Sequence, residues 1–325
     1  MFKTVITDSV YQNIISVEEK KKPSSRSYLY RLLANCKALD RLVLLTAEET
    51  ATLAEHPEIV MENPSSFYVL DIAPEKAKAI QESYGVMCTS GANPDMFLLI
   101  DVNDIHNPNQ GEKLGRGWDS VLDSVEDLPS NALVVTDRYL FTSRNKNIGD
   151  GLDNMRCILH ELLPERLDGE FQLTVVFCKD KMDESYTFSQ VAQKLHNIVK
   201  QQVNGRYPFT TELFGIPEGT SFYDRLHSRR IVSNYYLVEA THKLAAFNQR
   251  VGTAQQTLIP MGLFTKSSLR GESTPPLNSI DQTVKNFSLF YRQILSPKYT
   301  KVKYLYALNG EVKPKCTGIR NRLLK

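Results

Sequence analysis

The chain has 325 residues, of which 42% are hydrophobic and 23% are charged, and its formal net charge is +2. These values are typical of a globular protein with a substantial core, and they exclude an intrinsically disordered chain. No stretch approaches the roughly 20 apolar residues of a membrane-spanning helix. The first residues lack the long apolar segment of a secretory signal, so we expect a cytoplasmic protein without a membrane span.

The five cysteines lie far apart, and no C-x-x-C pair is present. This spacing favours reduced thiols in a reducing compartment over a disulfide framework or a zinc site. We therefore expect no metal and no cofactor. The cysteines are Cys36, Cys88, Cys157, Cys178 and Cys316.

Composition divides the chain into three parts. Residues 1–27 form a short N-terminal segment that ends in a charged linker, and residues 28–260 form the predicted body. Residues 261–325 hold 12 Lys and Arg against 3 acidic residues, whereas the preceding 260 residues carry a net charge of −7. A basic segment next to an acidic body is typical of a polyanion-binding surface, or of a segment that docks on the body itself.

The first half of the body contains short apolar runs separated by turn residues. Runs at 67–70, 96–100 and 131–143 are candidate strands, and Pro74 suits the first turn of a helix. The polar stretch 104–130 between the last two runs is expected to be a long loop or insertion.

The second half repeats this order. Residues 171–177 and 209–216 are expected to be strands, and Thr187 is a candidate N-cap for a helix between them that Asn204-Gly205 ends. Residues 226–238 are expected to form one further strand. Alternating strands and helices predict an α/β fold of mixed sheets layered with helices.

Two of these segments can be aligned without a gap. Residues 135–143 match residues 226–234, with Arg138 on Arg229 and apolar residues on apolar residues. We interpret this match as an internal duplication with repeats at 28–165 and 166–260, although short matches of this kind also arise by chance.

The most informative segment carries His227, Arg229 and Asn234 in the spacing H-x-R-x4-N. On a strand, residues i and i+2 point to the same face, so the imidazole and the guanidinium would lie side by side. An imidazole can attack phosphorus or transfer a proton, and a guanidinium can stabilise phosphoryl oxygens.

This spacing resembles the H-x-K-x4-D motif of the phospholipase D-like superfamily. The resemblance implies a two-repeat α/β sandwich in which two motif histidines meet, one as the nucleophile and one as the general acid. The first repeat departs from the pattern, because Thr136 stands at the histidine position and Ser143 at the acid position. One chain therefore lacks the second histidine of that mechanism.

These departures favour a non-catalytic module that binds phosphate through Arg138, Arg229 and Arg230. One alternative is a metal-independent phosphodiesterase or nuclease that uses His227 with Arg229 and Asn234. A second alternative is a protein-interaction scaffold in a multicomponent system, such as a defence or mobile-element system. The histidine and arginine can also simply bind a neighbouring carboxylate at the edge of a sheet.

The basic end is expected to contain a helix over residues 279–295, then a strand that turns at Asn309-Gly310 into a hairpin. Its alternating lysines and tyrosines suit contact with a nucleic-acid backbone and bases, although lysines also protect edge strands. Expected partners are nucleic acid or another phosphate-bearing ligand, and a homodimer or a larger assembly. The candidate nucleic-acid-binding residues are Lys298, Lys301, Lys303, Tyr304, Lys313, Lys315, Arg320 and Arg322.

Overall fold

The computed structural model describes residues 2–92, 128–142, 149–219, 229–240, 258–262, 285, 303–308, 311–313 and 321–324. The strands at 258–262, 303–308 and 311–313 are described by their backbone alone. The predictions for His227, the apolar run at 96–100 and nearly all of the helix at 279–295 lie outside these residues.

The N-terminal part is a four-stranded parallel sheet. Its strands are β1 (Thr4–Thr7), β2 (Leu42–Leu45), β3 (Phe67–Leu70) and β4 (Met87–Ser90), in the order β2-β1-β3-β4. Because β1 pairs with β2 on one side and with β3 on the other, it lies inside this sheet. Residues 4–7 of the predicted N-terminal segment therefore share a sheet with strands of the predicted body.

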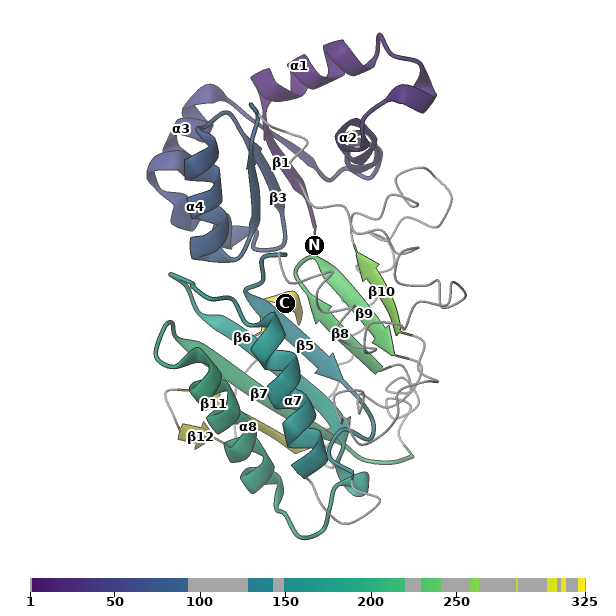
Figure 1. Ribbon diagram of the computed structural model, residues 1–325, viewed down its shortest axis with the longest axis vertical. Helices are drawn as coiled ribbons and strands as arrows, with labels where there is room; N and C mark the ends of the chain where they lie inside the picture. Colours follow the sequence, from purple (N-terminus) through teal and green to yellow (C-terminus); the bar gives the residue numbers. More distant parts are fainter. Residues whose placement is uncertain are drawn as a thin grey trace, which may run out of the picture.

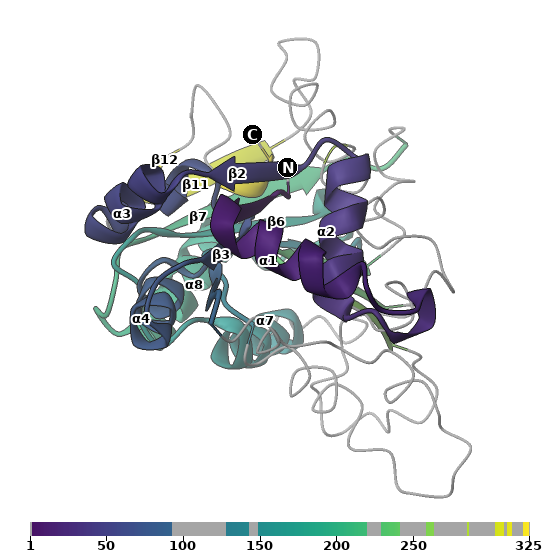
Figure 2. The ribbon, with the colours of Figure 1, turned by 90° about the horizontal axis from the view of Figure 1, so that it is seen from above.

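Helices cover both faces of the parallel sheet (Figures 1 and 2). Side chains from α1 (Asp8–Glu18) and α2 (Tyr28–Ala38) pack with Ile6 and Val69, whereas side chains from α3 (Ala47–Glu55) and α4 (Pro74–Tyr84) pack with Val5 and Leu70. Neighbouring residues of one strand thus enter different cores, as the period of a strand requires. The predicted helix start at Pro74 is confirmed.

The second sheet is mixed. Its eight strands follow the order β10-β9-β8-β5-β6-β7-β11-β12, in which β5, β6 and β7 are parallel and the remaining pairs are antiparallel. Side chains are described for five neighbouring strands of this sheet, which are β9, β8, β5, β6 and β7. The strands are β5 (Ala132–Thr136), β6 (Phe171–Cys178), β7 (Phe209–Ile216), β8 (Arg229–Ser233), β9 (Tyr236–Ala240), β10 (Leu258–Gly262), β11 (Lys303–Leu308) and β12 (Glu311–Lys313).

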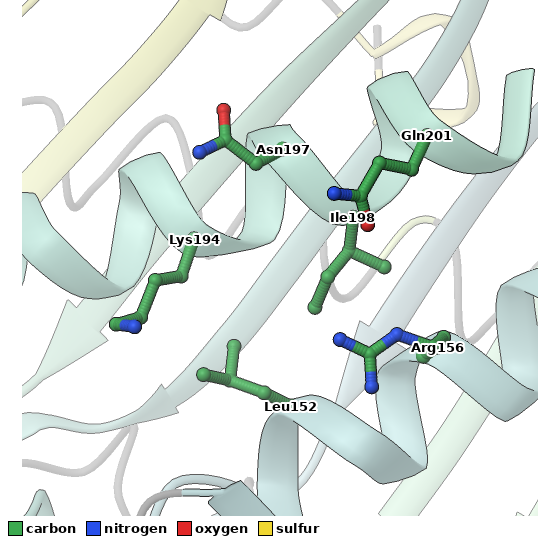
Figure 3. A pocket seen from close by; sticks show the side chains of 6 residues that line it. All are labelled: Leu152, Arg156, Lys194, Asn197, Ile198 and Gln201. Atoms are coloured by element: carbon green, nitrogen blue, oxygen red, sulfur yellow. The ribbon is translucent and has the colours of Figure 1, made fainter. Parts of the chain in front are cut away.

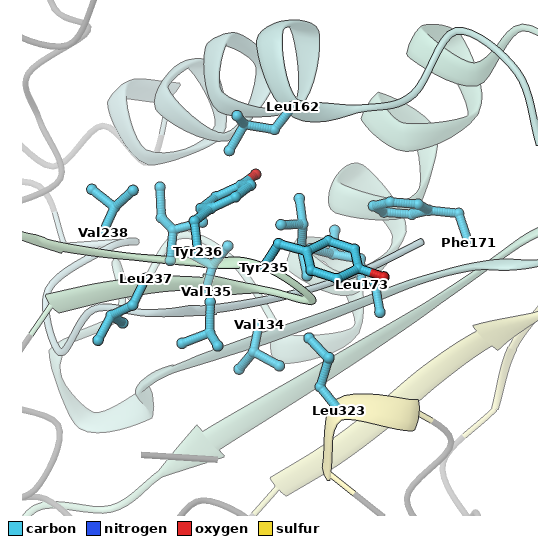
Figure 4. Packing of buried hydrophobic residues seen from close by; sticks show 14 of the residues in the cluster. Val134, Val135, Leu162, Phe171, Leu173, Tyr235, Tyr236, Leu237, Val238 and Leu323 are labelled. Atoms are coloured by element: carbon cyan, nitrogen blue, oxygen red, sulfur yellow. The ribbon is translucent and has the colours of Figure 1, made fainter. Parts of the chain in front are cut away.

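Two helices, α7 (Gly149–Leu162) and α8 (Phe188–Val203), cover one face of the mixed sheet (Figure 1). The predicted N-cap of α8 is confirmed, because Thr187 and Gln190 form a complete capping box. Asn204, in a left-handed conformation with φ 49°, ends the helix as predicted. The short 3-10 helix η6 (Arg322–Leu324) lies against the opposite face, so Leu162 and Leu323 flank the strands from two sides (Figure 4).

Two strand predictions require correction. The strand expected over 226–238 is divided, because Asn234 and Tyr235 turn between β8 and β9, and the Ser233 hydroxyl accepts hydrogen bonds from the backbone N–H groups of Tyr235 and Tyr236. The strand expected over 131–143 ends at Thr136, and residues 138–141 form a turn.

The two segments aligned in the predicted duplication differ in structure. Residues 138–141 form a turn, whereas their counterparts 229–232 lie in β8. The first predicted repeat is also divided between the sheets, since β3 and β4 belong to the parallel sheet and β5 belongs to the mixed one. The shared order of strand, helix and strand is thus present in two different sheets.

The predicted hairpin near the C-terminal end is confirmed, because β11 pairs with β12 through Leu308 and Glu311. The hairpin also joins the mixed sheet, since β11 pairs along its length with β7. Four cysteines, Cys36, Cys88, Cys157 and Cys178, are free thiols as expected. Among the described residues, none of the helices combines the length and the apolar composition that a membrane crossing requires.

Candidate functional site

The candidate site lies where the parallel strands of the mixed sheet end. β5 ends at Thr136, and Asp137 follows it with no exposed surface. The backbone N–H of Asp137 donates to Val176 O of β6 (3.1 Å), and its carboxylate accepts a hydrogen bond from the N–H of Tyr139 (2.8 Å). An aspartate that bonds the backbone two residues later stabilises a turn, which explains why the chain leaves the sheet here.

Arg229 begins β8 beside this turn. In the antiparallel register Thr136 faces Arg230, so the next pair of positions brings Arg229 opposite Asp137. Their side chains form an ion pair, with 3.5 Å between Nε and Oδ1, and they are 11% and 0% exposed. Removing one partner of such a buried pair would leave a charge without compensation. Arg229 therefore binds a neighbouring carboxylate at the edge of the sheet, as one of the alternatives from the sequence predicted.

Arg138 and Arg229 meet at one aromatic ring. Their guanidinium carbons lie 6.0 Å and 5.9 Å from the centroid of the Tyr139 ring, within the range of cation–π attraction. The carbonyl of Arg138 also accepts a hydrogen bond from Cys178 N–H (3.1 Å), which ties the turn to the end of β6. The fold thus brings together two arginines that are 91 positions apart in the sequence.

Charged residues also follow β6 and β7 at the same edge of the sheet. The short 3-10 helix η5 (Lys179–Lys181) directly follows β6, and Lys181 pairs with Glu218 beyond β7 (2.6 Å). The backbone N–H of Glu218 in turn donates to Asp180 (2.8 Å). Sequence reasoning missed these residues, although a charged triplet directly after a buried strand was the signal available.

Two of these groups have shifted pKa values. Burial raises the pKa of the Asp180 carboxyl, but the hydrogen bond from Glu218 and the charges of Lys179 and Lys181 outweigh burial and lower it below its usual value. A hydrogen bond to Glu218, reinforced by its charge, raises the pKa of Lys181. Both shifts favour the charged forms, so this edge remains ionised near neutral pH.

Asn234 lies at the opposite end of β8 from Arg229. Five positions of a strand span about 16 Å, so the two side chains cannot act on one phosphate group. Asn234 is 3% exposed, and its Oδ1 accepts hydrogen bonds from the N–H groups of Asn131 (3.0 Å) and Ala132 (3.1 Å). Its Nδ2 donates to Asn131 Oδ1 (2.9 Å) and Pro64 O (3.0 Å). Asn234 therefore joins the two sheets, and the predicted catalytic set does not form one site through it.

Only some of the candidate nucleic-acid-binding residues are among those that the structure describes. Lys303 begins β11 opposite Gly215, near the carboxyl end of β7, and Tyr304 follows it. Lys313 ends β12, opposite Tyr306. Lys298, Lys301, Lys315 and Arg320 lie outside the described residues.

Arg322 has a structural position. Its Nη2 donates to Glu170 O (2.7 Å) and its Nε donates to Gln172 Oε1 (3.2 Å), which fastens η6 to β6. Burial lowers the pKa of this guanidinium, partly offset by the charge of Glu170. These hydrogen bonds give the half-buried Arg322 a structural role between η6 and β6.

A shallow groove lies elsewhere, between α7 and α8. Its volume is about 210 Å³, and it is lined by Leu152, Arg156, Lys194, Asn197, Ile198 and Gln201 (Figure 3). This volume is below the roughly 300 Å³ at which small-molecule sites begin. Arg156 already pairs with Asp153 (2.5 Å), so we place the candidate site at the sheet edge instead.

No protein-family model matches the chain, and no curated protein matches it at a significant level. Within the described ranges, no group of three or more His, Cys, Asp or Glu side chains is arranged to hold a metal ion.

Proposed function

We propose that this chain is a non-catalytic module that binds a phosphate-bearing ligand, with nucleic acid as the favoured class. The observation that carries the proposal is the approach of Arg138 and Arg229 to the ring of Tyr139. Guanidinium groups bind phosphate oxygens through paired, charge-assisted hydrogen bonds. Ligands of α/β sheets also bind outside the carboxyl ends of the parallel strands, which is where these arginines lie.

The ion pair with Asp137 supports this proposal by fixing Arg229. A guanidinium that is already held by a neighbour loses little conformational entropy when it binds a ligand. Arg138 approaches the same ring from the turn, and Arg230 occupies the next position of β8. Arg138 and Arg229 are thus neighbours at one edge of the sheet, whereas Arg230, as the next residue of the strand, points to the other face of the sheet.

The absence of catalysis is part of the proposal. A phosphodiesterase would need His227 together with a supporting group, and the hydrogen bonds of Asn234 hold it at the far end of β8. The relationship to phospholipase D-like proteins stays a prediction. It is supported by the H-x-R-x4-N spacing alone, because the strands of the first predicted repeat are divided between two sheets.

Calorimetric titration with inorganic phosphate and a mononucleotide at low salt tests the proposal. We expect Arg138→Gln to weaken phosphate binding about tenfold, because one charge-assisted hydrogen bond contributes about 1.5 kcal/mol. Asp137→Asn should strengthen binding, because removing the negative charge beside Arg229 outweighs the looser hold on its guanidinium, and the amide keeps the oxygen that Tyr139 N–H bonds. Arg166→Gln is the matched control, because Arg166 pairs with Asp168 in the connection that enters the amino end of β6.

Folding of each variant is checked by thermal unfolding. Phosphate affinity that is equal in wild type, Arg138→Gln and Asp137→Asn would contradict the proposed site. Cleavage of DNA or RNA in chelator that disappears in His227→Ala would establish the phosphodiesterase alternative. A chain that binds neither phosphate nor nucleic acid would favour the scaffold.

A further inference from the structure

The carboxyl edge of the mixed sheet gathers cations from four distant parts of the sequence. Arg138 follows β5, Lys179 and Lys181 follow β6, and Arg229 and Arg230 begin β8. Lys303 begins β11, whose antiparallel pairing with β7 places it beside Gly215 at the same edge. We call these six residues the basic row: Arg138, Lys179, Lys181, Arg229, Arg230 and Lys303.

The row follows the order of the strands. β8, β5, β6, β7 and β11 are consecutive neighbours in the sheet, so the row runs across the strands from Arg229 to Lys303. Neighbouring strands lie about 4.8 Å apart, and four such intervals give a length of about 19 Å. The row is therefore several times longer than a single phosphate group.

Carboxylates lie among the cations of the row, and Glu239 stands opposite Arg230 in the register of β8 and β9. Asp137 pairs with Arg229, Asp180 with Lys179 (3.2 Å), and Glu218 with Lys181. The Asp180 and Glu218 side chains are 40% and 41% exposed. Ion pairs at such exposure contribute little to stability, so a phosphate can compete with these carboxylates for the lysines.

We propose that the basic row is a track on which single-stranded nucleic acid lies across the ends of the strands. This inference rests on the proposed phosphate site and adds the form, the path and the length of the ligand. Backbone phosphates follow the cations, and bases stack on Tyr139 and on the guanidinium planes beside it. A duplex is less suitable, because its bases face inward and cannot reach an aromatic ring at a sheet edge.

Fluorescence anisotropy with labelled oligonucleotides tests the track. We expect affinity for single-stranded DNA or RNA to rise with length over the first several nucleotides and then to level off, because the row is only about 19 Å long. A duplex of the same length should bind more weakly than the single strand. Equal affinity for dimers and dodecamers, or preference for the duplex, would overturn the track.

Lysine variants test the far end of the row. Lys179→Gln and Lys303→Gln should each lower the slope of log affinity against log salt by about 0.7 for a hexamer, because each variant loses one phosphate contact. Lys78→Gln is the matched control, because Lys78 pairs with Glu82 on α4 in the parallel-sheet part of the chain.

Inorganic phosphate separates this inference from the proposed function. Lys303→Gln should leave phosphate affinity unchanged, since the phosphate site is at Arg138 and Arg229, whereas hexamer affinity should fall. If phosphate binds and hexamer affinity is insensitive to Lys179 and Lys303, the track is overturned while the phosphate site stands. If phosphate does not bind to a folded wild-type chain, the proposed function itself fails.

Discussion

Asn234 uses both halves of its side-chain amide, and this explains why an amide stands there. The oxygen accepts two backbone N–H groups, from Asn131 and Ala132, and the nitrogen donates to Pro64 O, Ser65 Oγ and Asn131 Oδ1. A carboxylate offers acceptors alone, so it could not serve the second group of partners. Asn234, the last residue of the H-x-R-x4-N spacing, is therefore a structural residue.

Asn234→Asp is expected to destabilise the protein by about 3 kcal/mol and to create no phosphodiesterase activity. The new carboxylate would face the oxygens of Pro64 and Asn131 in a buried site and would lose the donor hydrogen bonds. Urea unfolding gives the stability, and a phosphodiester substrate in chelator gives the activity. Asn197→Asp is the control, because Asn197 is exposed on α8 and bonds Gln193 alone among the hydrogen bonds described for it. A stable, active Asn234→Asp variant would instead support the catalytic interpretation.

The turn that carries Arg138 and Tyr139 depends on helix α7. A Cβ added at Gly151, in the first turn of α7, would lie 2.1 Å from the carbonyl oxygen of Leu140. The hydroxyl of Thr142 donates to Lys181 O (2.7 Å) and joins the turn to η5 on the other side. The arginine site is thus positioned by close packing of one helix and one connection against the end of β5.

Gly151→Ala should reduce both stability and phosphate affinity. Alanine in place of glycine usually stabilises a helix by about 1 kcal/mol, but here the backbone of the turn would have to move away and shift Arg138. Gly169→Ala is the control, because its Cβ would meet only Met61 Cε at 3.8 Å, an ordinary contact. Thermal unfolding and phosphate titration provide the two measurements, and a Gly151→Ala variant as stable as the control would refute the packing argument.

The two sheets share one hydrophobic core. The cluster that contains Ile6 and Val69 of the parallel sheet also contains Val135, Val175 and Tyr235 of the mixed sheet. Tyr235 reaches between them, since its hydroxyl accepts from Met87 N–H (2.9 Å) and donates to Ser66 O (2.8 Å). Complete burial raises the pKa of this phenol well above its usual value, so Tyr235 stays neutral.

We expect the parallel and mixed sheets to unfold together in one transition. Tyr235→Phe should lower the free energy of unfolding by about 2 kcal/mol, because the Met87 N–H would lose its acceptor in a buried site, and the transition should remain single. Circular dichroism and intrinsic fluorescence should report the same midpoint. Two separate midpoints, with only one of them shifted by Tyr235→Phe, would show that the sheets are independent units.

Short-range signals account for the successful predictions. Pro74 begins α4 and Thr187 caps α8 as expected, and β11 pairs with β12 as expected. Each signal acts within a few residues, through a fixed φ, a capping hydrogen bond or a tight turn. The prediction of one strand over 226–238 was wrong. It rested on apolar residues that continue through Tyr235 and Tyr236, but the backbone N–H groups of these two residues donate to the Ser233 hydroxyl, and the chain turns there.

The α/β class and the ends of several elements were thus encoded locally in the chain. The partner of each strand was not, because pairing depends on contacts between residues that are far apart in sequence. β1 was expected in a separate segment and became an inner strand, and Asn131 and Asn234 proved to be partners across the junction of the two sheets. Arg138 and Arg229 lie at one edge of the sheet with Lys179, Lys181 and Lys303. The order and direction of the strands bring these residues together, because they decide which strand ends are neighbours.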